Sequence, residues 1–241
     1  MRRFLTFFAL ASLGLWCLLQ MRARGDAGWQ KLDNGLEMRT IQQRAGMSVI
    51  TITAIRAPAS RVHIGSGGLW RAPEWAAKTG ALAVVNGGYF NDQAQPLGLR
   101  VSDGKRTNPI YARANWGVFA IRDGRAFIAH TRDYNPSPNT RQAMQCGPRL
   151  AVDGKTTDLK QQWARRSGVG VDARGRVVVA VSDGALSFDD WAKLWVDEGA
   201  MNCPNALNLD GGGSTQMSVK SKNHPREVRG AWPVPDVVLV K

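Results

Sequence analysis

The feature that most constrains this chain is a carboxylate followed by three consecutive glycines, Asp210-Gly211-Gly212-Gly213. A glycine run costs backbone entropy, so a fold keeps it where positive φ or the close approach of another group is needed. The apolar run before it predicts a short strand that ends at Asp210. Backbone N–H groups beside that carboxylate favour a site for an anionic or hydroxyl-rich ligand. A glycine-rich turn with Asp as its turn residue is the alternative, and the spacing supports both.

Residues 1–27 form a segment distinct from the rest of the chain. Met1-Arg2-Arg3 is positively charged, the sequence from Phe4 to Met21 is almost entirely apolar, and small residues precede Gly28. This order is typical of a secretory signal peptide. The apolar run is long for that purpose, so an N-terminal membrane anchor is the alternative. Both interpretations predict that residues 28–241 lie outside the cytoplasm, periplasmic or secreted, and reach the inner membrane only through the N-terminal segment.

The chain is strongly basic, with a formal net charge of +13 over 241 residues. Residues 1–27 contribute four Arg and one Asp, so the remaining body keeps a charge of +10. An exported basic body predicts anionic partners such as polyanionic glycans, sugar phosphates or a lipid surface, although a basic surface can also serve solubility alone. The Lys and Arg residues are dispersed and no nucleic-acid-binding signature occurs, so we expect no nucleic acid partner.

Three cysteines are present, and Cys17 belongs to the N-terminal segment. Cys146 and Cys203 remain as an even pair in a chain expected to meet an oxidising compartment, which predicts a disulfide between them. Two separate free thiols are the alternative. Neither cysteine has the CxxC or HxxH spacing of a metal site, so no metal ligands are expected there.

Turn signals and short apolar runs predict a strand-rich chain. Asp33-Asn34-Gly35 indicates a hairpin between Trp29 and Thr40, because Asn-Gly supplies the positive φ of a tight turn. Further hairpin turns are predicted at three Asp-Gly pairs: Asp103-Gly104, Asp123-Gly124 and Asp153-Gly154. Together with the two helices below, these elements predict one α+β domain over residues 28–241, with a mixed or antiparallel twisted sheet and a few packing helices.

Two helices are predicted from their end signals. Residues from Pro73 to Thr79 have proline in the first turn and Gly80 at the end. A second helix follows Ser187, which can cap its N-terminus with Asp190 three residues later. Aromatic and aliphatic side chains then recur at helical spacing and indicate a buried face: Phe188, Trp191, Leu194 and Trp195.

Four segments share one design, an apolar strand beside glycine and polar residues. They are Asn86-Gly87-Gly88-Tyr89-Phe90-Asn91, residues 165–172 from Arg165 to Asp172, Val181-Ser182-Asp183-Gly184, and Asp210-Gly211-Gly212-Gly213-Ser214. If their strands end at a common edge, a cleft there would hold the carboxylates Asp183 and Asp210, the amide of Asn86 and the guanidinium of Arg166. Each segment alone has a simpler interpretation as a turn, a strand cap or a surface charge.

Other catalytic signatures are missing from the sequence. The three histidines lie far apart without metal-ligand spacing, and His63 is expected to pack in the core. There is no Gly-x-Ser-x-Gly elbow, Walker motif or Rossmann fingerprint, so no cofactor is expected. A divalent cation held by Asp183 and Asp210 stays open as the mark of a metal-dependent phosphodiesterase.

These motifs resemble the phosphodiester glycosidase family in order and spacing, and most closely a bacterial exported branch of it. The resemblance is carried by Asn86-Gly87-Gly88-Tyr89-Phe90, Gln145-Cys146-Gly147-Pro148, Arg166 with Gly170-Val171-Asp172, and Leu209-Asp210-Gly211-Gly212-Gly213-Ser214. It covers about residues 30–241. One departure is Gly168, where the family often has alanine two residues after the arginine.

The resemblance implies hydrolysis between the anomeric carbon of a sugar and a phosphate. Asp210 or Asp183 would act as base or nucleophile, and Arg166 would bind phosphate with its two-pronged guanidinium. Substrate contacts are expected from the two glycine-containing loops: Asn86, Gly87, Gly88, Tyr89, Gly211, Gly212, Gly213 and Ser214. A non-catalytic module that binds an anionic glycan is the main alternative, since it would keep the cleft without the chemistry.

Overall fold

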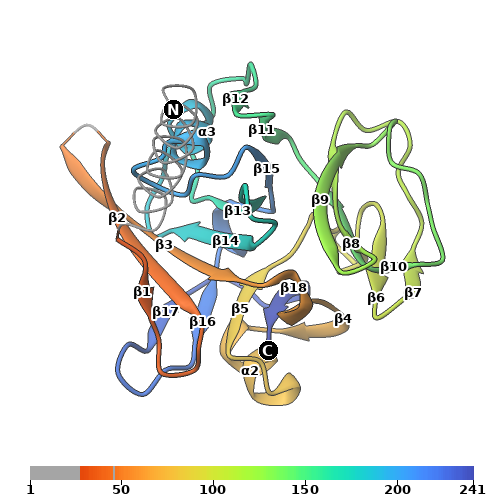
Figure 1. The fold of residues 1–241 in the computed structure, drawn as a ribbon, viewed down its shortest axis with the longest axis horizontal. Helices are drawn as coiled ribbons and strands as arrows, with labels where there is room; N and C mark the ends of the chain where they lie inside the picture. Colours follow the sequence, from red (N-terminus) through yellow and green to blue (C-terminus); the bar gives the residue numbers. More distant parts are fainter. Residues whose placement is uncertain (1–27, 46) are drawn as a thin grey trace, which may run out of the picture.

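The computed structural model describes residues 28–45 and 47–241 (Figure 1). The strands are β1 (Gln30–Lys31), β2 (Glu37–Ala45), β3 (Ser48–Ala57), β4 (Val62–Trp70), β5 (Ala83–Asn86), β6 (Arg100–Ser102), β7 (Lys105–Asn108), β8 (Gly117–Arg122), β9 (Arg125–His130), β10 (Thr140–Cys146), β11 (Arg149–Val152), β12 (Lys155–Thr156), β13 (Ser167–Val171), β14 (Val177–Ser182), β15 (Asn205–Asn208), β16 (Met217–Val219), β17 (Arg226–Val228) and β18 (Val234–Val240). The α-helices are α2 (Ala72–Thr79) and α3 (Phe188–Val196).

The described residues form three antiparallel sheets, where one mixed or antiparallel sheet was expected. Their strand orders are β1-β2-β3-β14-β13-β15-β11-β12, β7-β6-β10-β8-β9 and β17-β16-β5-β18-β4. Figure 1 shows the five-stranded sheet of β6 to β10, called the β6–β10 sheet below, on the right. Helix α3 lies near the top and α2 at the bottom of the same view. The expected α+β class therefore holds broadly, but within residues 28–45 and 47–241 the fold is mainly β, with two α-helices.

The main core lies where the three sheets face one another. It combines Val179 and Leu207 of the eight-stranded sheet, Val238 of β18, and Phe119 and Met144 of the β6–β10 sheet, all essentially unexposed. Burial of large apolar side chains contributes about 1.5–3 kcal/mol each. Because strands from all three sheets share this core, the strand ends around it are held in fixed relative positions.

Helix α3 covers the other face of the eight-stranded sheet. Ser187 caps it as predicted, accepting a hydrogen bond from the backbone N–H of Asp190 at 3.1 Å. Trp191 and Trp195 are fully buried against the sheet. A Cβ atom at Gly168 would lie only 2.7 Å from the Trp195 ring, so the glycine that departs from the family pattern makes room for this tryptophan.

The local turn predictions are confirmed. Asp103, Asp123 and Asp153, and the glycine after each, all have positive φ. Strands β1 and β2 pair across the predicted Asp33-Asn34-Gly35 turn. Helix α2 ends at Gly80, which has a φ of 70°.

The predicted disulfide between Cys146 and Cys203 is wrong, because both cysteines are free and buried. Cys146 ends β10 and packs in the main core, whereas Cys203 packs beneath α3 in the core on the other side of the eight-stranded sheet. The sheet separates the two sulfur atoms. Burial raises the pKa of Cys146 to about 12, so this thiol stays protonated at neutral pH.

His63 also differs from the prediction of a packed core histidine. It lies on β4, but its side chain is 27% exposed and its Nδ1 is 3.0 Å from Oδ1 of Asp103. The neighbouring positions of the strand, Val62 and Ile64, carry the buried side chains. Alternation along the strand therefore turns the histidine outward.

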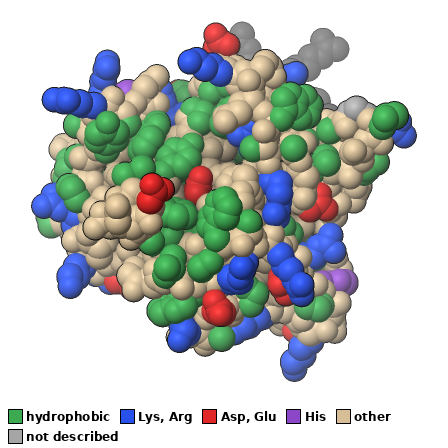
Figure 2. Space-filling view, turned by 180° about the vertical axis from the view of Figure 1, so that it is seen from behind, with side chains coloured by type: hydrophobic (Ala, Val, Ile, Leu, Met, Phe, Trp, Pro, Cys, Tyr) green, Lys and Arg blue, Asp and Glu red, His purple; other side chains and the backbone are tan. Residues whose placement is uncertain are grey.

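On the face shown in Figure 2, Lys and Arg side chains are spread out, while hydrophobic side chains gather near its middle. Residues 1–27, with the expected signal peptide or anchor and Cys17, lie outside the described residues. Within residues 28–45 and 47–241, no helix is long and apolar enough to cross a bilayer.

The buried free thiols predict that a reductant will not change stability. Thermal unfolding of the full chain should give the same Tm with and without excess dithiothreitol. Loss of a native disulfide would instead cost about 2–5 kcal/mol and lower the Tm by several degrees. A reproducible drop of that size would show that Cys146 and Cys203 are linked after all.

Candidate functional site

Strand ends from two sheets meet at one edge of the main core. Ser167 begins β13, Ser182 ends β14 and Asn208 ends β15, and these antiparallel neighbours place the three residues at the same end of the sheet. Asn86 ends β5 in the sheet ordered β17-β16-β5-β18-β4, called the β4–β18 sheet below. Its side chain reaches the three residues by accepting a hydrogen bond from the hydroxyl of Ser167. The predicted convergence of the glycine-containing segments is therefore present for Asn86 and for the loop that follows β15.

Asn86 fastens these strand ends together. Its Nδ2 donates to the carbonyl of Asp210 at 2.7 Å. Its Oδ1 accepts from the hydroxyl of Ser167 at 2.7 Å and from the backbone N–H of Gln216 at 3.1 Å. The side chain is fully buried. Because both ends of the amide already have protein partners, the geometry assigns Asn86 to positioning Asp210.

Asp210 is the carboxylate at the centre of this edge. Its backbone N–H donates to the carbonyl of Gly87 at 3.0 Å, and its Oδ1 accepts from the N–H of Gly211 at 2.9 Å. Burial raises the pKa of Asp210 to about 6, and hydrogen bonds from Ser214 and Gly211 partly offset that rise. A carboxyl with this pKa can accept or release a proton near neutral pH.

The three glycines after Asp210 are explained mainly by close packing. A Cβ at Gly211 would lie 2.7 Å from the carbonyl oxygen of Arg165, and one at Gly213 would lie 2.2 Å from the ring of Trp232. Gly212 has a φ of +59°, and its N–H donates to Arg165 at 2.8 Å. Of the three N–H groups expected to cradle a phosphate, only that of Gly213 has no acceptor among the described residues.

Gly87 and Gly88 are glycines because a buried ion pair lies against them. Arg100 donates from Nε to Asp236 at 2.8 Å, and both side chains are fully buried. A Cβ at Gly87 would lie 1.8 Å from Oδ1 of Asp236, and one at Gly88 would lie 2.3 Å from Nη2 of Arg100. Sequence reasoning missed this pair. Its signal was a single charged residue within an otherwise apolar strand.

Tyr89 forms an aromatic wall beside Asp210. Its hydroxyl donates to the carbonyl of Gly147 at 2.5 Å, and Nδ2 of Asn208 donates to the same oxygen at 3.1 Å. The Tyr89 ring lies 5.1 Å from that of Trp116, which lies 5.8 Å from that of the half-exposed Tyr111. Burial raises the pKa of Tyr89, and the charge of Asp210 contributes to this rise.

Asn208 adds an acceptor that sequence reasoning missed. Its Oδ1 is buried and receives no hydrogen bond from any described residue, while its Nδ2 is occupied by backbone carbonyls. A buried acceptor without a donor costs about 1–3 kcal/mol. A ligand hydroxyl or a water molecule that donates a hydrogen bond to Oδ1 of Asn208 would remove this cost.

Arg166 is buried behind the strand ends. Its guanidinium stacks on the ring of Phe188 at 3.6 Å, its Nε donates to the carbonyl of Leu186 at 3.1 Å, and Nη2 donates to the carbonyl of Gln162. Burial lowers its pKa to about 10, so it stays charged. Two of its three nitrogens are thus held by the protein, and only Nη1 makes no hydrogen bond within the described chain.

Asp183 lies in a cleft whose lining does not include Asp210. It is exposed, its Oδ1 accepts from the backbone N–H of Thr51 at 2.8 Å, and it lines a cleft together with Arg165. No hydrogen bond among the described residues joins it to Asp210. The structure therefore brings Asn86, Tyr89, Ser214 and Asp210 together and leaves Asp183 outside that group. Among residues 28–45 and 47–241, no three His, Cys, Asp or Glu side chains cluster as metal ligands would.

Residues 79–241 match the family model described as phosphodiester glycosidase. The chain is 28% identical over 140 residues to the uncharacterized protein YigE of Escherichia coli. The aligned segment covers 53% of this chain. The alignment spans about half of that relative, 54% of its length.

Solved structures show the same fold at low sequence identity. The catalytic domain of zebrafish N-acetylglucosamine-1-phosphodiester alpha-N-acetylglucosaminidase superposes with a TM-score of 0.70 at 21% identity, covering 88% of this chain and 85% of that one. A protein of Burkholderia pseudomallei described as exported gives a TM-score of 0.57 at 14% identity, covering 80% and 74%. Both likenesses concern the fold.

The raised pKa of Asp210 predicts a pH-dependent stability gain in Asp210→Asn. The folded state binds the Asp210 proton more tightly than the unfolded state, so ionising this group costs stability as pH rises from about 4 through 6. A shift from 3.8 to about 6 corresponds to about 3 kcal/mol. Denaturant unfolding should therefore show the variant more stable by that order at pH 8 and equal to wild type below pH 4.

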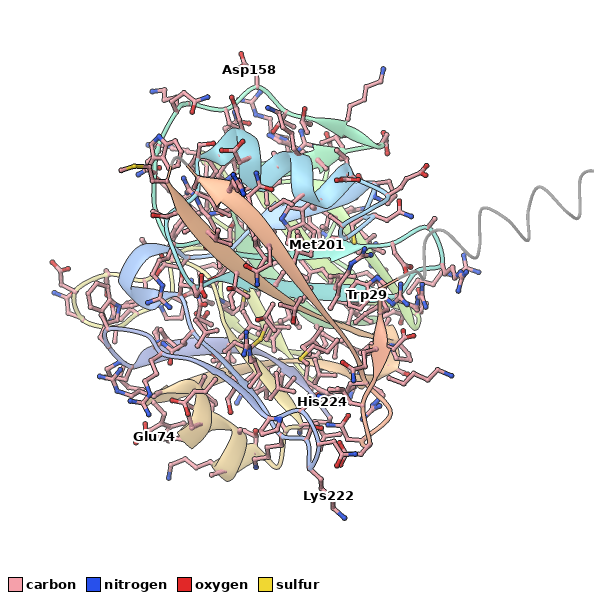
Figure 3. All side chains as sticks on the ribbon, turned by 90° about the vertical axis from the view of Figure 1, so that its left-hand side faces the viewer. Trp29, Glu74, Asp158, Met201, Lys222 and His224 are labelled. Carbon is pink, nitrogen blue, oxygen red and sulfur yellow. The ribbon has the colours of Figure 1, made fainter. Side chains whose placement is uncertain are left out.

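A matched control separates this effect from the change in net charge. Asp158→Asn makes the same replacement on an exposed loop, at the position labelled in Figure 3. Its unfolding free energy should change little across the same pH range. Equal stability of wild type and Asp210→Asn at pH 8 would contradict the burial argument.

Proposed function

The chain belongs to the phosphodiester glycosidase family, and on that premise we propose that it hydrolyses the bond between a sugar's anomeric carbon and a phosphate. The substrate is an anionic glycan of the envelope or extracellular space. The protein encounters it after the N-terminal segment, residues 1–27, has directed its export. The apolar N-terminal segment, the net charge of +13 and the exported relative with the same fold support this location. A basic surface attracts such a substrate over long range.

The observation that carries the proposal is the buried position of the Asp210 carboxyl, whose Oδ1 accepts from Gly211 while Asn86 and Gly87 hold its backbone; burial raises its pKa to about 6. Near neutral pH it takes a proton from a water molecule while that water's oxygen attacks the anomeric carbon. The bond from that carbon to the phosphate oxygen breaks, and its electron pair leaves with the phosphate monoester. Because phosphate is a weakly basic leaving group, it needs little protonation.

The remaining residues divide into binding and positioning roles. The positive charge of Arg166 interacts electrostatically with Tyr89. Its Nη1, which makes no hydrogen bond within the described chain, contacts the phosphate. The N–H of Gly213 is the free donor of the glycine loop. Asn86, with Gly87 in the adjoining turn, holds the backbone of Asp210. Asp183 opens onto the neighbouring cleft, which leaves Asp210 as the base.

Asp210→Asn should lower kcat by about 100-fold or more, because a positioned general base contributes about 10²–10⁴. The full-length protein is assayed on an aryl glycosyl phosphodiester, with NMR detection of the anomeric product. The variant should stay folded, since its amide oxygen can still accept from Gly211. Undiminished turnover would remove Asp210 from the mechanism.

Asp183→Asn is the matched carboxylate control and should keep kcat within a few-fold of wild type. An equal loss in both variants would restore the carboxylate pair as the catalytic unit. Tight glycan binding by wild type without hydrolysis of any phosphodiester tested would instead identify a binding module.

A further inference from the structure

A cleft that contains three arginines adjoins the glycine loop. It has a volume of about 420 Å³ and is lined by Thr53, Arg165, Asp183 and residues 226–229. Residues 226–228 form β17, which follows the loop carrying Lys222 and His224, labelled in Figure 3. Arg165 joins the cleft to the glycine loop, because its carbonyl accepts the N–H of Gly212 at 2.8 Å. The cleft thus begins directly beside the Asp210 loop.

The arginines of this cleft have free hydrogen-bond donors. Nε of Arg165 is buried without a partner among the described residues, while its Nη1 donates to the carbonyl of Arg229 at 2.9 Å. No side-chain hydrogen bond or ion pair holds Arg226 within the described chain. Arg229 is largely exposed, and its Nε pairs with Glu227 at 3.0 Å. A buried guanidinium nitrogen without an acceptor is costly, so the arrangement favours a ligand that supplies anionic oxygens.

The cleft also contains carboxylates, which decides the class of ligand. Asp183 and Glu227 line it together with the three arginines. A bare anion would use the arginines alone, whereas a sugar that carries a phosphate can use both kinds of group. Its hydroxyls donate to the carboxylates and its phosphate accepts from the arginines. The mixture therefore fits one sugar phosphate unit.

We propose that this cleft binds the neighbouring repeat of a polymeric sugar phosphate while Asp210 acts on the adjoining linkage. The inference rests on the proposed function, because it names the substrate as a chain of phosphodiester-linked sugars rather than a single phosphodiester. Arg165 and Arg226 contact the phosphate of that repeat, and Asp183 contacts its hydroxyls. In this arrangement the exposed carboxylate of Asp183, which lies apart from Asp210, binds substrate.

Calorimetry with the full-length protein tests the subsite. The probes are a synthetic oligomer of hexose-1-phosphate repeats and the matching single-unit phosphodiester, with Asp210→Asn as background so that neither is consumed. The oligomer should bind at least about tenfold more tightly than the single unit, since each 1.4 kcal/mol of added contact gives a factor of ten. Arg226→Ala combined with Arg229→Ala should remove most of that advantage.

The control double variant, Arg125→Ala with Lys155→Ala, removes the same charge from exposed positions at the starts of β9 and β12, in the two other sheets. It should keep the preference for the oligomer. An equal loss in both double variants would reduce the effect to general electrostatics, and equal affinity of the Asp210→Asn background for the two probes would overturn the subsite. Failure of hydrolysis in the kinetic assay, with the binding preference intact, would contradict the proposed reaction and leave the subsite standing.

Discussion

The interaction on which the site depends is the buried ion pair between Arg100 and Asp236. It joins β6 to β18, and Oδ1 of Asp236 also accepts the N–H of Gly88 at 2.8 Å. Removing one partner of such a pair costs about 3–5 kcal/mol, because the other charge stays buried alone. The pair shapes the Gly87-Gly88 turn, and the carbonyl of Gly87 in turn receives the backbone N–H of Asp210. The position of the central carboxylate therefore derives from a fully buried contact.

Asn86 performs the matching task on the other side of Asp210. By binding the Asp210 carbonyl and the Ser167 hydroxyl, it connects the β4–β18 sheet to the eight-stranded sheet. Rigid support of this kind allows a carboxylate to stay buried despite the cost of ionising it. The raised pKa of Asp210 reflects that cost.

Local features were predicted well because they depend on neighbours in sequence. The Asp-Gly turns, the Ser187 cap and the end of α2 at Gly80 each involve a few consecutive residues. The clustering of Asn86 with the loop after Asp210 was also predicted, because both follow apolar strands. The roles of the glycines were predicted less well. A glycine leaves space, but the sequence does not say whether Trp232, Asp236 or a ligand fills it.

The sequence by itself determined the strand-rich character, the turns, the family and the presence of a carboxylate in a glycine loop. Tertiary structure alone decided that three sheets share one core, and that Cys146 and Cys203 lie in cores on opposite sides of a sheet. It also decided that Arg165 lines the cleft with Asp183 while Arg166 stacks on Phe188. The two arginines are adjacent in the segment that leads into β13, and their different surroundings come from elements distant in sequence, β17 for Arg165 and the start of α3 for Arg166. Which face meets a ligand depends on sheets paired from distant parts of the chain.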